Sequence, residues 1–265
     1  SLSVATYKSS SIGAGVRFGY PIAEDDRINF GLAIDQTKID VFDTSPAPYI
    51  SFVNNFGDTA RSLVASAGWA RDRRDSFLYP TSGVYQRASL EVATPVLDLR
   101  YVRASYQHQH WFPFGGGHAL MLNGDVGYAH GYDGKELPFY KNFYAGGIGS
   151  VRGYQQSTLG PRYIDANNYT RSLGGNRRAV ANAEYYFPMP GQGKDKSMRL
   201  SLFADAGYVW GPDDKVQASD LRYSAGLAFS WSSPVGPLKF SLGQALKKED
   251  GDRTQKFQFQ LGTVF

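Results

Sequence analysis

Long segments of period-two alternation are the feature that most constrains how this chain can fold. Side chains two residues apart share one side of a β-sheet. The segment 221–231 places Leu221, Tyr223, Ala225, Leu227, Phe229 and Trp231 against Arg222, Ser224, Gly226, Ala228 and Ser230. Such runs exceed the usual strand of a soluble sheet and have the length of a tilted strand that crosses a bilayer. The pattern therefore predicts an all-β protein, a transmembrane antiparallel β-barrel with a polar lumen.

The same alternation predicts where the strands and connections lie. We expect strands near 2–8, 11–23, 26–39, 61–73, 82–94, 98–112, 117–130, 177–188, 198–210, 221–233, 237–248 and 255–265. Short connections, such as 23–25 and 234–236, alternate with long ones at 41–60 and 131–176. Short turns at one end and long loops at the other are typical of outer-membrane barrels.

Composition narrows the classes of protein further. The mean hydropathy is −0.37, and no stretch approaches the roughly 20 apolar residues of a spanning helix, so only a closed barrel could cross a membrane. The chain has no Cys, which excludes a disulfide framework and a thiolate metal site. Its net charge of +4 is modest and scattered, so we expect no nucleic-acid partner.

The connection 131–176 is too long for an ordinary loop of a compact domain. Its residues 136–164 are rich in Gly and aromatic side chains, a composition that argues against disorder. We therefore expect a folded hairpin that packs against the rest of the barrel.

Several motifs make the resemblance to a known family specific. They are PFYKNFYAGG at 138–147, VRGY at 151–154, LGPR at 159–162, GGN at 174–176, FADAGYVW at 203–210, SAGLAFSWSSPVGPLKFSL at 224–242 and FQFQLGTVF at 257–265. In these motifs, and in their order, the chain resembles the BamA-type outer-membrane assembly factors of Gram-negative bacteria. The resemblance implies that residues 1–265 form about 12 strands of a barrel of about 16 strands. The first strands and the periplasmic modules would then lie outside this chain.

The resemblance also implies a loop latch, in which the VRGY loop folds back into the lumen and its Arg meets acidic residues on the wall. The alternation independently places Glu184 and Asp205 on the polar face, and a planar guanidinium matches two carboxylates well. The expected loop latch consists of Val151, Arg152, Gly153, Tyr154, Glu184 and Asp205. The alternative is that Arg152 is only an exposed loop cation.

The last segment carries a second expected site, a C-terminal strand signal that also forms a seam. Its members are Phe257, Phe259, Leu261, Gly262 and Phe265. Alternating apolar residues with a terminal aromatic mark outer-membrane barrels for insertion in proteins of this kind. An unpaired strand edge at the seam, where first and last strands meet, would template pairing with another strand.

The resemblance implies a non-enzymatic insertase that folds and inserts β-barrel proteins into the outer membrane. Its expected partners are nascent outer-membrane proteins, accessory assembly lipoproteins and outer-membrane lipids, and no cofactor is expected. A passive outer-membrane pore, or a sibling translocation or secretion barrel of the same superfamily, remains open. His108 and His110 share a strand face but predict no metal site, and Ser150 lacks the flanking residues of a hydrolase nucleophile.

Overall fold

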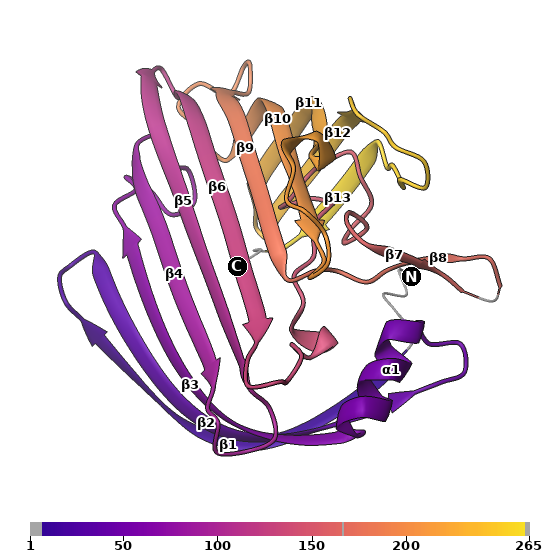
Figure 1. Ribbon diagram of the computed structural model, residues 1–265. Helices are drawn as coiled ribbons and strands as arrows, with labels where there is room; N and C mark the ends of the chain where they lie inside the picture. Colours follow the sequence, from indigo (N-terminus) through magenta and orange to yellow (C-terminus); the bar gives the residue numbers. More distant parts are fainter. Residues whose placement is uncertain (1–6, 166, 263–265) are drawn as a thin grey trace.

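The structure, a computed structural model, describes residues 7–165 and 167–262. It is dominated by one antiparallel sheet of eleven strands that curls around a concave face as an open partial barrel (Figure 1). In order across the sheet, the strands are β1 (Tyr7–Pro21), β2 (Asp26–Val41), β3 (Thr59–Asp72), β4 (Gly83–Ala93), β5 (Tyr101–Gly115), β6 (His118–Gly131), β9 (Arg177–Pro188), β10 (Met198–Trp210), β11 (Arg222–Ser233), β12 (Gly236–Ala245) and β13 (Phe257–Leu261). Within the described part of the chain, β1 and β13 are the two edges and do not pair with each other.

The long connections gather at one end of the sheet, which we call the loop end. They contain helix α1 (Ala47–Phe56), the single turns η1 (Phe139–Lys141) and η2 (Ala218–Asp220), and a small hairpin of β7 (Arg162–Ile164) and β8 (Thr170–Ser172). The opposite end carries shorter connections, such as 22–25 and 116–117. In the described residues, no helix is long and apolar enough to cross a membrane.

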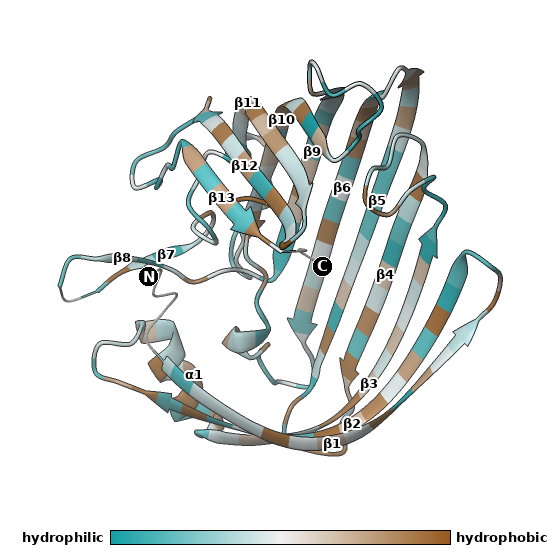
Figure 2. Ribbon diagram, turned by 180° about the vertical axis from the view of Figure 1, so that it is seen from behind, coloured by the Kyte–Doolittle hydropathy of each residue, from teal (hydrophilic) through white to brown (hydrophobic). Residues whose placement is uncertain are grey.

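The faces of the sheet are inverted relative to a soluble protein. On β10, the outward Leu202 is 51% exposed, whereas the neighbouring inward Ser201 is 1% exposed. Figure 2 shows hydrophobic and hydrophilic residues alternating along the strands. Apolar side chains outside and polar side chains inside are the arrangement of a barrel wall in lipid, so the predicted fold class is confirmed.

Three details differ from the predicted segments. Residues 7–21 form one continuous strand where a break was predicted near residue 9, because Ser9 and Ser10 keep the register opposite Ile39 and Lys38. The connection 41–60 contains α1, and the hairpin expected within 131–176 is formed by β7 and β8, so it extends beyond residue 164. The first predicted strand falls mainly on residues outside the described range, and so does Phe265.

An aromatic cluster fixes the start of the long connection between β6 and β9, residues 132–176, hereafter the inner loop. Tyr49 of α1 and Phe139 of η1 stack with ring centroids 4.0 Å apart, and Ile39 and Phe52 complete the buried group. Stacked and edge-to-face rings add about 0.5–1.5 kcal/mol per pair beyond their buried area. The loop is therefore anchored before it reaches the concave face.

Candidate functional site

The inner loop lies on the concave face of the sheet and supplies a core of its own. Val151, Tyr154 and Leu159 from the loop are fully buried against Val180 of β9 and Val209 of β10. Gly207 of β10 makes room for this packing, since a Cβ there would lie 2.8 Å from a methyl carbon of Val151. The aromatic and apolar composition of the loop thus serves packing against the barrel wall.

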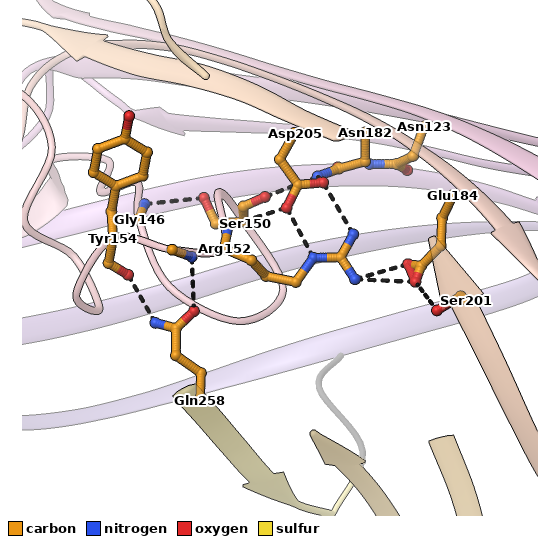
Figure 3. Close-up of polar contacts among 11 residues, drawn as sticks. Asn123, Gly146, Ser150, Arg152, Tyr154, Asn182, Glu184, Ser201, Asp205 and Gln258 are labelled. Carbon is orange, nitrogen blue, oxygen red and sulfur yellow. Dashed lines mark hydrogen bonds and ion pairs between the residues drawn. The ribbon is translucent and has the colours of Figure 1, made fainter. Parts of the chain in front are cut away.

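Arg152 joins the inner loop to two strands through both carboxylates that the sequence pattern placed on the polar face. Its Nε donates to Asp205 Oδ2 at 2.8 Å and its Nη2 to Asp205 Oδ1 at 2.9 Å. Its Nη1 donates to Glu184 Oε1 at 2.8 Å and to Oε2 at 3.0 Å (Figure 3). Arg152, Glu184 and Asp205 are 9%, 5% and 3% exposed, so Arg152 is not an exposed loop cation.

The surroundings of Arg152 compensate its burial. The guanidinium carbon lies 3.7 Å from the ring centroid of Phe203, a cation–π contact. Burial opposes the charge, but Glu184 and Asp205 outweigh it and hold the pKa of the Arg152 guanidinium above its ordinary value. Ser201 Oγ donates to Glu184 Oε2 at 2.9 Å, so this oxygen, which accepts the longer of the two bonds from Arg152 Nη1, has a second donor.

A ladder of side-chain amides, which the sequence did not reveal, ends on Asp205. Gln107 Nε2 donates to Asn123 Oδ1 at 2.9 Å, Asn123 Nδ2 to Asn182 Oδ1 at 2.9 Å, and Asn182 Nδ2 to Asp205 Oδ1 at 2.8 Å. The ladder crosses β5, β6, β9 and β10: Asn123, Asn182 and Asp205 lie directly opposite one another, and Gln107 reaches Asn123 diagonally. Each amide fixes the orientation of the next, and Asn182 also donates to the Ser150 carbonyl of the inner loop at 2.8 Å, so the ladder holds both Asp205 and the loop that carries Arg152.

Gly153 allows the backbone of the inner loop to touch the wall. Its φ of +89° lies in the left-handed region, and a Cβ there would lie 3.3 Å from the backbone carbonyl carbon of Gly243 in β12. A Cβ on Gly243 would lie 2.8 Å from the amide nitrogen of Gly153. Any side chain at either position would push the loop away.

Gly153 and Tyr154 also contact the last part of the chain, from β11 to β13. The Tyr154 hydroxyl donates to the Tyr223 carbonyl at 2.9 Å and also contacts the Lys247 carbonyl. Gln258 of β13 hydrogen-bonds the backbone of Gly153 and Tyr154. Gln258 was not among the predicted site residues, although its inward position on the last strand could have pointed to it.

A second ion cluster lies beside these contacts. Arg222 Nε donates to Asp252 Oδ2 at 2.6 Å, and Arg162 of the inner loop contacts the same carboxylate. Burial raises the pKa of Asp252, but hydrogen bonds from Arg222 and the Glu249 amide outweigh it and leave the pKa below its ordinary value. The connection between β12 and β13, residues 246–256, is thus tied by charge to the inner loop and to β11.

Three of the predicted seam residues lie on β13, and Gly262 follows its last residue. Phe257, Phe259 and Leu261 point outward and are exposed, and Gly262 donates from its amide to the Pro237 carbonyl at 2.8 Å. Phe265 lies outside the described residues.

The hydrogen-bond pattern identifies which backbone groups of β13 point away from β12, along the edge that we call the free edge because no strand of residues 7–165 and 167–262 pairs there. Gly243 donates to the Lys256 carbonyl at 2.8 Å, so even-numbered residues face β12 and odd-numbered residues face the other edge. The N–H and C=O groups of Phe257, Phe259 and Leu261 therefore line an edge that no strand of the described chain occupies.

The weaker candidates have ordinary surroundings. His110 stacks on Phe112 with centroids 4.2 Å apart, and the Tyr106 hydroxyl lies 3.3 Å from His108 Nδ1, all on one face of β5. Ser150 Oγ accepts a bond from the Gly146 amide at 3.1 Å, within a turn of the inner loop. Among the described residues, no cluster of three or more His, Cys, Asp or Glu side chains could hold a metal ion.

Comparison with known proteins agrees with this architecture. The Omp85 superfamily domain matches residues 2–265. The chain is 41% identical to the outer membrane protein assembly factor BamA of Neisseria meningitidis serogroup B, over 298 aligned positions covering 100% of this chain and 37% of that protein. It is 27% identical to the protein of the same name from Nitratidesulfovibrio vulgaris, covering 98% of this chain and 32% of that one. The chain thus spans about a third of the length of these relatives.

Solved structures give the same result. The crystal structure of BamA from Haemophilus ducreyi lacking POTRA domains 1–3 superimposes with a TM-score of 0.86 and 27% identity, covering 96% of this chain and 54% of that one. CdiB from Acinetobacter baumannii superimposes with a TM-score of 0.58 and 15% identity, covering 96% of this chain and 42% of that one, a likeness of fold alone.

Proposed function

This chain belongs to the Omp85 superfamily and is an outer-membrane β-barrel protein, and we propose that its last strand is the working edge of an insertase for other barrels. The relatives that carry the name outer membrane protein assembly factor support a general role in barrel assembly. The lateral seam, the role of the loop latch and the partners belong to the proposal.

The outer edge of β13 is the observation that carries the proposal. The N–H and C=O groups of Phe257, Phe259 and Leu261 point away from β12, where the backbone of an incoming strand could pair with them, and strand addition at such an edge is a common mode of recognition. In lipid every unpaired backbone group costs several kcal/mol, so pairing with the client strand is itself favourable. No nucleotide is needed for this step.

The loop latch keeps the inner loop on the barrel wall while the edge of β13 pairs with a client strand. Arg152, held by Glu184 and Asp205, places the loop across the concave face next to β13. The proposed clients are nascent outer-membrane proteins, with accessory lipoproteins as partners. Outer-membrane lipids form the third partner, since a locally thinned bilayer beside the seam would lower the cost of insertion.

A passive pore is the main alternative. An open pore needs a clear lumen, whereas the buried side chains of Val151, Tyr154 and Leu159 hold the inner loop on the concave face. A sibling secretion barrel shares the fold, but the likeness to CdiB, at 15% identity, extends to the fold alone. Neither alternative has a specific observation in its favour.

Reconstitution of the protein in lipid vesicles tests the proposal directly. We expect an added, denatured client barrel to become protease-resistant several-fold faster in these vesicles than in empty ones, with small and flickering conductance. Steady, large conductance without faster folding of the client would contradict the proposal and identify a pore.

A further inference from the structure

We propose that the inner loop is also a clamp on the last strand, with Gln258 as the positioning residue that holds the loop end of β13 in register. The inference deepens the proposed function, on which its importance for assembly rests. The clamp itself consists of contacts between residues 153–155 of the inner loop and residues 253–258.

Backbone pairing is the first part of the clamp. Gln155 donates from its amide to the Arg253 carbonyl at 3.0 Å, Gln255 donates to the Gly153 carbonyl at 2.9 Å, and Tyr154 forms an antiparallel bridge with Thr254. Pairing of β13 with β12 reaches Gly243 and Lys256 at this end. Residues 153–155 thus pair with the segment that leads into β13, just beyond the last residues of this segment that bond to β12.

The side chain of Gln258 is the second part. It is 5% exposed, its Oε1 accepts from the Gly153 amide at 3.1 Å, and its Nε2 donates to the Tyr154 carbonyl at 2.7 Å. Figure 3 shows its amide group directed at the loop backbone, next to Arg152. A primary amide has both a donor and an acceptor, so it binds a peptide N–H and a peptide C=O as a neighbouring strand would.

Gln260, the next inward residue of β13, shows that a glutamine on this strand bonds to the loop only at the right position. Gln260 faces the same side of β13, yet its Oε1 is buried and has no hydrogen-bond partner in the described structure. The same residue type, two positions along one strand, therefore provides a matched control.

The clamp connects the last strand to the loop latch through two adjacent residues. Arg152 is bonded to β9 and β10, and the adjacent Gly153 is bonded to β13, so one loop segment bridges strands that are separated by β11 and β12. The Asp252 cluster adds a second tie between the inner loop and the connection that leads into β13. Movement of Arg152 away from its acids must displace the backbone that holds the last strand.

Hydrogen–deuterium exchange of the protein in lipid vesicles, without any client, tests the clamp. In Gln258→Leu we expect the amides of residues 253–258 to exchange about tenfold faster, because two hydrogen bonds to the loop are lost. Gln260→Leu should exchange like the parent, and residues 177–188 of β9 should be unchanged in both. Equal exchange of 253–258 in the two variants would overturn the proposal.

Two further variants refine the result. Gln258→Glu keeps the acceptor for the Gly153 amide and loses the donor to the Tyr154 carbonyl. We therefore expect an intermediate increase in the exchange rate of residues 253–258. This variant provides the test if Gln258→Leu does not fold. Arg152→Met should also speed exchange at residues 253–258, although Arg152 forms no hydrogen bond with this segment. Unchanged exchange there would refute the coupling between the loop latch and the clamp. Client folding is measured in a separate experiment. If the parent protein does not fold clients, the proposed function is contradicted, but the exchange rates still test whether the clamp exists.

Discussion

Replacing Arg152 by glutamate is expected to detach the inner loop and to reduce client folding to near the rate in empty vesicles. The change would place a third carboxylate between Glu184 and Asp205, which are both buried. Breaking a buried ion pair costs about 3 to 5 kcal/mol, which lowers the population of the seated loop by more than about a hundredfold. Protease sensitivity of residues 132–176 would report the detached loop, and client folding would report the effect on assembly.

A compensating change separates the loop latch from general damage. In the double variant Arg152→Glu with Asp205→Arg, the ion pair is restored with reversed polarity, and we expect partial recovery of both readouts. Arg100→Glu serves as the control, because Arg100 forms a partly exposed pair with Asp133 at 3.2 Å, which contributes about 1 kcal/mol at most. If the Arg152→Glu protein folds clients at the parent rate, the loop latch has no part in assembly.

Phe259→Pro is expected to have the second largest effect, a severe loss of client folding in a barrel that remains intact. The Phe259 amide faces the free edge of β13, so proline removes a donor from the seam and leaves the hydrogen bonds of Gln258 and Gln260 with β12 in place. The rate at which a client becomes protease-resistant in vesicles measures the loss.

Phe259→Val is the matched control for this prediction. Valine also shortens the outward side chain but keeps the N–H group and suits a strand. We expect it to retain most of the parent rate. Equal rates for the proline and valine variants would show that the free N–H groups of the last strand do not take part.

The sequence predicted the fold well because the alternation has a physical cause that acts at every strand. Lipid outside and polar surroundings inside sort side chains with period two, so the strands β2–β6 and β9–β12 of the large sheet fall close to the predicted segments. Helix α1 was missed because its ten residues have no side-chain cap, and it is held by packing of Tyr49 and Phe52 on Ile39 and Phe139. Such tertiary packing is not visible in a local pattern.

The site was only partly predictable for a related reason. The polar face could be assigned to Glu184 and Asp205 from parity alone, and the structure brings both to Arg152. The amide ladder and Gln258 depend on the register between neighbouring strands, such as Asp205 opposite Asn182. Parity states which side a residue faces, but only register states which residues share a level of the wall.

Disulfide trapping of a stalled client tests the central claim that the free edge of β13 receives client strands. Because the chain has no Cys, a single cysteine can be placed at Phe259 and compared with one at Ala181, which faces outward on β9 within the sheet. We predict that a client stalled during folding, with cysteines at successive positions of its terminal strand, forms disulfides with position 259 in one register and none with position 181. Trapping at 181 as efficient as at 259, or no trapping at 259 in any register, would contradict the account.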